Sequence, residues 1–231
     1  MMKQIIAMGG GGFSMEPENP LLDDYVLDQV EKERPKICFV PTASGDADSY
    51  IERFYEAFKE KAEATHLSLF KPPTRDLRKF LLEQDIIYVG GGSTKNLLAL
   101  WREWGLDEIM KEAWEQGVVL AGISAGAICW FDEGVTDSYG DQLEPLECLG
   151  FLAGSCCPHY DGEEKRKPAY TSFIKDGSIR PGYALDDGAA VHFVNTDPVI
   201  HVSSRKGAKG YYVRVEAEEV EENDLEMKYL G

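Results

Sequence analysis

A Gly-x-Ser-x-Gly pattern, Gly122 to Gly126, is the stretch of this chain with the plainest potential for chemistry. It follows the apolar run VVLA and opens the small, apolar run AGAICWF, so a buried strand should lead into a short helix. A serine on such a turn needs glycines on both flanks, because side chains there would clash with neighbouring strands. Ser124 is therefore a candidate nucleophile. The competing interpretation is a packing hydroxyl where a strand meets a helix.

A serine hydroxyl is a weak nucleophile at neutral pH and needs an adjacent base, usually histidine. The chain has four histidines. His66 begins the run HLSLF, and His192 and His201 alternate with apolar neighbours, which is typical of strand positions. His159 instead follows CCP and precedes the polar segment YDGEEKRK, in a loop after a short strand, where catalytic residues tend to lie. We therefore expect His159 to be the base.

An acid must hold the imidazole of that base in one tautomer. Asp186 and Asp187 end a short apolar run and precede a glycine, at a predicted strand terminus. Asp137 and Asp141 lie in the loop after the predicted short helix. The residue pattern ranks these four carboxylates only weakly, so all remain candidates.

Two glycine clusters follow predicted strands, at residues 9–12 and 90–92. The first does not satisfy GxGxxG, and the chain has no GxxxxGK[ST] pattern, so neither a dinucleotide site nor an ATPase-type phosphate loop is expected. The second places backbone N–H groups where ligands bind in open parallel sheets, and such donors can form half of an oxyanion hole. The alternative is a tight turn with Ser93 or Thr94 capping the next helix.

These residues need a scaffold, and the chain alternates short apolar runs with longer amphipathic segments. Strands separated by helices of ten or more residues are the pattern of a parallel sheet covered on both faces. The sequence therefore predicts a doubly wound α/β fold. The expected strands lie at residues 4–8, 36–42, 66–70, 85–89 and 118–122, and the main helices at 49–64, 74–84, 93–105 and 106–117.

The last third of the chain differs from this alternation. PVIHVSS and YYVRVEA flank the Gly-containing segment RKGAKG, which predicts an antiparallel hairpin at the sheet edge. No internal repeat or Pro/Ser-rich linker interrupts the sequence. We expect one domain that covers residues 1–231.

Composition narrows the class of protein. The net charge of −17 disfavours nucleic-acid or anionic-membrane binding, because both need a surplus of Lys and Arg on one face. The five cysteines include no CxxC pair, so neither a disulfide framework nor a metal site is indicated. The N-terminal apolar run is too short for a signal peptide, and we expect a cytoplasmic protein without a cofactor, as a monomer or homodimer.

The sequence resembles the peptidase E family of serine peptidases, which also contains the cyanophycinases, on the class I glutamine amidotransferase-like fold. The resemblance is carried in the family's order by FVPTAS at 39–44, YVGGGSTKNLL at 88–98, GISAGAICW at 122–130, the CPHYD segment around His159, and ALDDGAAV at 184–191.

The resemblance implies a Ser-His-acid triad in which Ser124 is the nucleophile and His159 the base. The family carries its acid just before a glycine in a late strand-turn, which is Asp187 here. Family members often have glutamate at that place, so Asp137 stays in reserve as the acid.

The resemblance also assigns binding groups. The backbone N–H groups of Gly91 or Gly92, together with that of Ala125, would form the oxyanion hole. Peptidase E removes an N-terminal aspartate, chiefly from dipeptides, and Arg166 matches the place of the family's aspartate-binding arginine. A guanidinium suits that role because it grips a carboxylate through two hydrogen bonds.

Other functions compete with a peptidase acting on small peptides. An α/β-hydrolase esterase could use Ser124, Asp137 and His159, although Val89 stands where an HGGG-type oxyanion motif needs glycine. A cyanophycinase-like enzyme would cut β-aspartyl-arginine. A cysteine-dependent amidotransferase would need a thiol at position 124, whereas Cys129 comes five residues later. A non-catalytic binding protein would keep its ligand affinity in Ser124→Ala.

Overall fold

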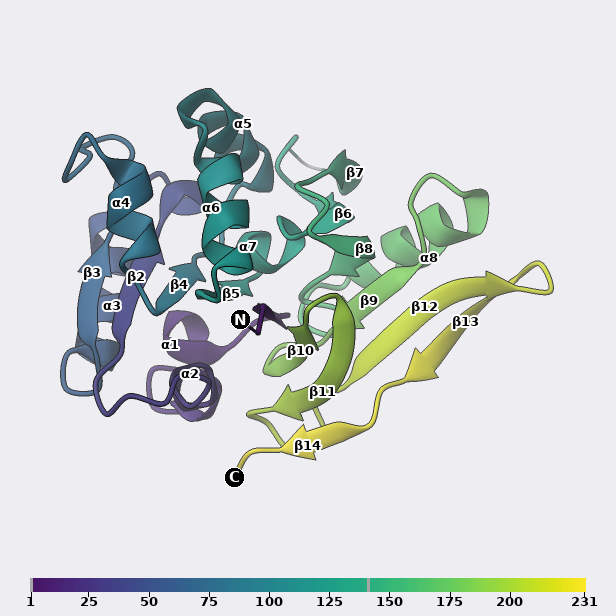
Figure 1. Ribbon diagram of the computed structural model, residues 1–231. Helices are drawn as coiled ribbons and strands as arrows, with labels where there is room; N and C mark the ends of the chain where they lie inside the picture. Colours follow the sequence, from purple (N-terminus) through teal and green to yellow (C-terminus); the bar gives the residue numbers. More distant parts are fainter. Residues whose placement is uncertain (1, 141) are drawn as a thin grey trace.

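The larger of two β-sheets has eight strands, and its centre is parallel (Figure 1). The computed structural model describes residues 2–140 and 142–231, and the strand order in this sheet is β14-β11-β10-β1-β5-β4-β2-β3. Its strands are β1 (Gln4–Met8), β2 (Lys36–Val40), β3 (Glu63–His66), β4 (Ile86–Val89), β5 (Val119–Ile123), β10 (Ala189–Val194), β11 (Asp197–Ser203) and β14 (Met227–Tyr229). The run from β1 to β3 is parallel throughout, whereas β10 is antiparallel to both of its neighbours. The predicted parallel α/β sheet is confirmed.

Helices cover both faces of this sheet, as the alternation of segments predicts (Figure 1). Side chains alternate between the faces along β1, where Ile5 and Ala7 join one buried cluster and Ile6 and Met8 join the other. One face is covered by α1 (Gly12–Met15), α2 (Leu21–Leu27) and α3 (Asp48–Phe58), and the other by α4 (Leu77–Leu82), α5 (Thr94–Trp104), α6 (Leu106–Glu115) and α7 (Ala125–Ile128).

A second sheet of six strands, in the order β13-β12-β9-β8-β6-β7, extends beside the first and was not predicted. Its strands are β6 (Phe131–Thr136), β7 (Glu144–Glu147), β8 (Leu152–Cys157), β9 (Gly182–Leu185), β12 (Gly210–Glu216) and β13 (Glu219–Asp224). Helix α8 (Arg166–Asp176) packs on it through Tyr170 and Ile174. Phe131 and Tyr183 join the core of the larger sheet, so the two sheets share buried contacts.

The C-terminal hairpin is present, but its pairing differs from the predicted one. β11 and β12, which correspond to PVIHVSS and YYVRVEA, lie in different sheets. β11 pairs with β10, and β12 forms the hairpin with β13. The turn of that hairpin is Ala217-Glu218, both at positive φ, which matches the right-handed twist of the strands. A smaller correction concerns His66, which ends β3 and does not begin a strand.

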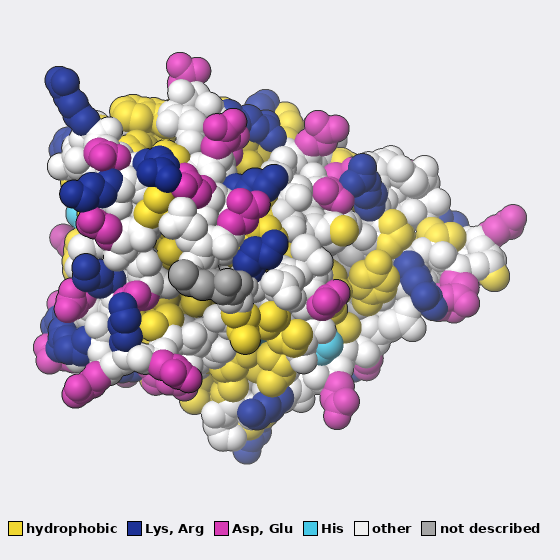
Figure 2. Space-filling model, viewed as in Figure 1, with side chains coloured by type: hydrophobic (Ala, Val, Ile, Leu, Met, Phe, Trp, Pro, Cys, Tyr) yellow, Lys and Arg dark blue, Asp and Glu magenta, His cyan; other side chains and the backbone are white. Residues whose placement is uncertain are grey.

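On the face seen in Figure 1, charged side chains of both signs are interspersed. Figure 2 shows acidic and basic groups mixed over the face seen in Figure 1, with no block of one sign. No helix within the described residues is long and apolar enough to cross a bilayer.

Candidate active site

Ser124 lies at the turn between β5 and α7, in a backbone conformation that residues other than glycine rarely adopt. Its φ is 56° and its ψ is −116°. A Cβ on Gly122 would lie 1.9 Å from the Gly126 carbonyl oxygen, and a Cβ on Gly126 would lie 2.2 Å from that of Val89. The predicted strand-turn-helix context and the need for both glycines are confirmed. Such strained residues cluster at active sites.

A cavity of about 270 Å³ lies beside Ser124, at the carboxyl ends of the parallel strands β4 and β5. This edge is where ligands bind in open α/β sheets. His159 lines the same cavity, as do Tyr50 and Gly91. The structure therefore brings together the serine and the histidine that the sequence singles out. The Ser124 hydroxyl has no hydrogen-bond partner within residues 2–140 and 142–231.

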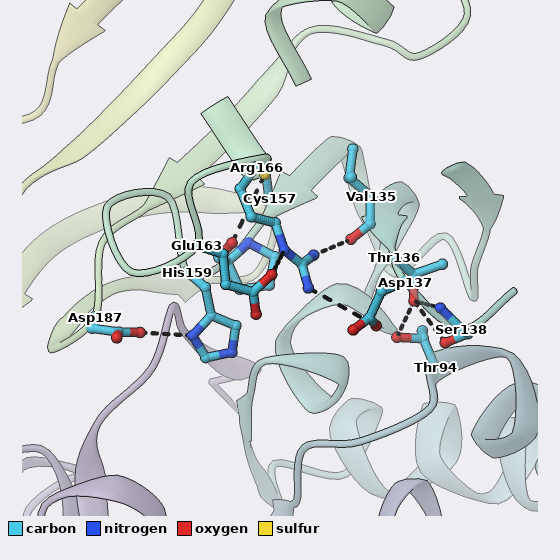
Figure 3. Close-up of polar contacts among 11 residues, drawn as sticks. Thr94, Val135, Thr136, Asp137, Ser138, Cys157, His159, Glu163, Arg166 and Asp187 are labelled. Atoms are coloured by element: carbon cyan, nitrogen blue, oxygen red, sulfur yellow. Dashed lines mark hydrogen bonds and ion pairs between the residues drawn. The ribbon is translucent and has the colours of Figure 1, made fainter. Parts of the chain in front are cut away.

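His159 follows β8 and is joined to a carboxylate (Figure 3). Its Nδ1 lies 2.6 Å from Asp187 Oδ1, and the two side chains are only 14% and 10% exposed. His159 itself has a positive φ of 53°. Its N–H donates to the Gly9 carbonyl at 3.2 Å, which ties the histidine loop to the loop after β1.

The Asp187 carboxylate sits in the turn between β9 and β10, in a space left open by glycines. A Cβ on Gly10 would lie 2.0 Å from Asp187 Oδ1, and one on Gly162 would lie 2.6 Å from Oδ2. The Asp187 N–H donates to Asp161 Oδ1 at 2.8 Å. Two glycines and a second aspartate therefore hold Asp187 against His159.

The other candidate acids and histidines lie elsewhere. Asp186 accepts a hydrogen bond from the Lys209 N–H, and burial raises the pKa of Asp186 to about 6. The Asp137 side chain is 62% exposed and faces Arg166. Asp141 lies outside the described residues. The three remaining histidines are strand residues that do not line the cavity: His66 in β3, His192 in β10 and His201 in β11.

The glycine loop after β4 packs against the serine turn. A Cβ on Gly91 would lie 3.2 Å from Ser124 Cβ and 3.7 Å from its Oγ. The Gly91 N–H donates to the Tyr50 hydroxyl at 3.2 Å. The N–H groups of Gly92 and Ala125 have no acceptor within the described part of the chain. Ser93 caps α5 by accepting from the Asn96 N–H, as the capping alternative predicts.

Arg166 faces a second, larger hollow of about 520 Å³ that Ser124 also lines. Ser124 and Gly92 line both hollows. Arg166 is nearly buried: its Nε donates to Glu163 Oε2 at 2.6 Å and its Nη1 to the Val135 carbonyl at 2.8 Å (Figure 3). Its Nη2 lies 4.0 Å from Asp137 Oδ1. This hollow holds one cation between two carboxylates.

The sequence assigns no role to Tyr50 and Glu163, which line the hollows, or to Asp161, which accepts the Asp187 N–H. Tyr50 carries no local signal, because only the fold brings α3 beside the glycine loop. Asp161 lies within CPHYD, and Glu163 stands three residues before Arg166, a spacing at which opposite charges meet on a helix or turn.

Comparison with known proteins places these features in a family. The profile of peptidase family S51 matches residues 5–200. The uncharacterized peptidase YgaJ of Bacillus subtilis is 62% identical over the full length of both chains. Peptidase E of Haemophilus influenzae is 26% identical over 86% of this chain and 91% of its own. The crystal structure of a peptidase from an acI-B1 actinobacterium superposes with a TM-score of 0.74 at 19% identity, covering 98% of this chain and 95% of that one.

Proposed function

Because this chain belongs to peptidase family S51 and is a serine peptidase, we propose that it is an exopeptidase for short peptides that works through a Ser124–His159–Asp187 triad. The observation that carries the proposal is the 2.6 Å contact between His159 Nδ1 and Asp187 in the wall of the cavity that Ser124 lines. The carboxylate fixes the proton on Nδ1 and leaves Nε2 as the basic nitrogen.

The proposed reaction begins with attack of Ser124 Oγ on the scissile carbonyl carbon, while the hydroxyl proton moves to His159 Nε2. The carbonyl π pair moves to oxygen and forms an oxyanion, which accepts hydrogen bonds from nearby donors. Collapse of this intermediate breaks the C–N bond, and the leaving amine takes the proton from His159. Water then attacks the acyl-serine carbonyl carbon and gives a proton to His159. The bond from that carbon to Ser124 Oγ breaks, His159 returns the proton to Oγ, and the acid product leaves.

The size of the cavity supports a small substrate. Its volume of about 270 Å³ lies just below the range of about 300–1,000 Å³ that small-molecule sites occupy. Because the second hollow meets this cavity at Ser124, a dipeptide bound across the serine can place one residue on each side.

The Arg166 hollow is the proposed place for the substrate's first side chain, with N-terminal aspartate as the preferred residue. A buried guanidinium is a strong carboxylate ligand. Its Nε is already bound to Glu163, so a substrate carboxylate binds through Nη2 or displaces the Glu163 side chain, which is 44% exposed. The negative charges of Asp137 and Glu163 reduce the attraction of Arg166 for a substrate carboxylate.

Fluorophosphonate labelling and a dipeptide panel test the proposal. Labelling of the intact protein, mapped by mass spectrometry, should modify Ser124 and be absent in Ser124→Ala. Asp-X, Leu-X and Arg-X dipeptides should be assayed with wild type, Ser124→Ala and Arg166→Ala. We expect Asp-X to be cleaved fastest and to lose the most in Arg166→Ala.

The outcomes separate the parts of the proposal. A folded wild type that is neither labelled nor active on any dipeptide would overturn the triad. Cleavage of Leu-X or Arg-X as fast as Asp-X would overturn the aspartate preference and leave the triad standing.

A further inference from the structure

The Tyr50 side chain reaches the Ser124 cavity from α3, an element that carries neither Ser124, His159 nor the glycine loop. The residue is 6% exposed. Its ring packs against those of Phe13 and Phe39, with centroids 5.5 and 5.0 Å away. Its hydroxyl oxygen lies 3.2 Å from the Gly91 nitrogen. Gly91 lies beside the nucleophile, because a Cβ added to it would be 3.7 Å from Ser124 Oγ. The phenol is thus held rigidly beside the serine turn.

We propose that the Tyr50 hydroxyl is an oxyanion donor that binds the substrate carbonyl oxygen as it becomes negative. The proposal rests on the serine-peptidase function argued above and adds a side-chain donor to the backbone donors expected from the glycine loop.

The hydrogen-bond directions at Tyr50 support this role. The Gly91 N–H donates to the phenol oxygen, so Tyr50 acts there as an acceptor. The nearby Ser14 hydroxyl also acts on the phenol oxygen as a donor, and the Tyr50 hydrogen has no acceptor within residues 2–140 and 142–231. A tyrosine hydroxyl donates one hydrogen bond, and this one is therefore available to a ligand in the cavity. The Gly91 N–H, by contrast, is already engaged, whereas those of Gly92 and Ala125 have no acceptor among the described residues.

The surroundings keep the donor in its protonated form. Burial raises the pKa of Tyr50, against the opposing effect of hydrogen bonds from Ser14 and the Gly91 N–H. The phenol therefore stays neutral at the pH where His159 must act as a base. Tyr50 lends a hydrogen bond and keeps its proton, so the proton balance of the reaction, from Ser124 to His159 to the leaving amine, is unchanged. A buried donor with a fixed position lowers the reaction barrier, because it stabilises the oxyanion without having to reorient during the reaction.

Tyr50→Phe tests the proposal, because the variant loses only one oxygen atom from a site packed by the ring. Two rates should be measured: dipeptide hydrolysis and the phosphonylation of Ser124 by a fluorophosphonate, whose phosphoryl oxygen occupies the same donors. We expect kcat and the phosphonylation rate to fall by about 100-fold or more, as for removal of one oxyanion donor. KM should change less than about threefold, since the ground-state carbonyl needs the bond less than the oxyanion does.

Tyr55→Phe is the matched control, because Tyr55 is on the same helix and its hydroxyl bonds to His66, outside the cavity. It should keep the wild-type rates. Thermal unfolding of both variants measures any loss of packing separately from the loss of rate.

The outcomes distinguish this inference from the proposed function. Wild type that is labelled at Ser124, with Tyr50→Phe labelled within threefold of the same rate, overturns the role of Tyr50 alone. The role of Tyr50 is also overturned if Tyr50→Phe keeps the wild-type kcat and only raises KM. Tyr50 would then bind the substrate and the transition state equally. Wild type that is not labelled overturns both.

Discussion

The two hollows that meet at Ser124 handle charge differently. In the cavity beside His159, the ionisable pair is one imidazole and one carboxylate, and the other polar groups are neutral donors such as the Tyr50 hydroxyl. In the hollow around Arg166, one guanidinium lies between Glu163 and Asp137. The cavity beside His159 suits stabilisation of charge that appears during the reaction. The hollow around Arg166 suits the replacement of the Glu163 carboxylate by a substrate carboxylate. Changes in the cavity should therefore act on kcat, and changes in the hollow on KM and substrate choice.

The largest contrast should come from two aspartates. Asp187→Asn keeps the shape of the carboxylate that contacts His159 but reverses the preferred tautomer, and by analogy with other triads kcat should fall by about 10⁴-fold. Asp137→Asn, in the other hollow, should change kcat less than about threefold and act mainly on KM. Steady-state kinetics on one dipeptide measures both. A larger fall of kcat in Asp137→Asn than in Asp187→Asn would assign the orienting acid to Asp137.

Gly10 leaves the space that the Asp187 and His159 side chains occupy. A Cβ at Gly10 would lie 2.0 Å from Asp187 Oδ1 and 3.0 Å from His159 Nδ1, so Gly10→Ala must push the pair apart. A displacement of about 1 Å in a catalytic group can cost about 100-fold in rate, and we expect a loss of that order in kcat/KM.

Gly177→Ala is the control for that substitution. Gly177 ends α8 in the left-handed region, and a Cβ there meets nothing within 4 Å. The variant should lower the unfolding temperature slightly and keep kcat/KM. Equal kinetic losses in the two variants would mean that Gly10 matters only for stability.

Local sequence patterns predict the parallel sheet and the serine turn. The parallel sheet follows from the spacing of apolar runs, and the conformation of Ser124 follows from its two flanking glycines, because both are local patterns. The choice of His159 by elimination agrees with its place in the cavity wall. The second sheet could not be predicted, because β6 contains Asp132, Glu133 and Gly134 and lacks an apolar alternation.

The features that the sequence could not predict depend on tertiary contacts. Asp186 and Asp187 are adjacent in the chain, and only the turn geometry decides that Asp187 meets His159 while Asp186 meets Lys209. Likewise, the pairing of β12 with β13, and not with β11, depends on which sheet edge is free. Tyr50 enters the cavity through helix packing, for which the sequence holds no motif.

A buried carboxylate on α2, outside the residues that line the two hollows, should make stability depend on pH. Asp23 is 4% exposed, accepts a hydrogen bond from Tyr88, and its Oδ1 lies 3.0 Å from the Cβ position of Gly12. Burial raises the pKa of Asp23 to about 7 from 3.8. The unfolded chain loses this proton near pH 4 and the folded chain near pH 7, so this group's contribution to stability is lost as pH rises through that window. The slope is at most about 1.4 kcal/mol per pH unit, or tenfold in the unfolding constant.

Asp23→Asn should remove that slope. The measurement is the difference in unfolding free energy between wild type and variant from pH 4 to 7, because the difference cancels other groups such as His192, whose burial lowers its pKa to about 4. Asp24→Asn, at an exposed carboxylate paired with Lys61, should retain the slope. An unchanged slope in Asp23→Asn would show that the buried acid does not titrate in this window.

Glu163 at the Arg166 hollow should give a smaller effect. Its substitution tests whether a substrate carboxylate can replace the Glu163 carboxylate at Arg166. Glu163→Gln removes one negative charge from the guanidinium while keeping a side chain of similar size at the 2.6 Å contact. A substrate carboxylate should then compete more easily for Arg166, and KM for Asp-X should fall by about threefold to fivefold, the range of a partly exposed ion pair worth up to about 1 kcal/mol. KM for Leu-X should stay the same, because an uncharged side chain gains nothing from the lost charge. Glu164→Gln removes the same charge from the neighbouring exposed position and should leave both KM values as they are. Equal changes for Asp-X and Leu-X would mean that Arg166 does not contact the substrate's first side chain, and the hollow would then serve only to anchor α8 through the bond to Val135.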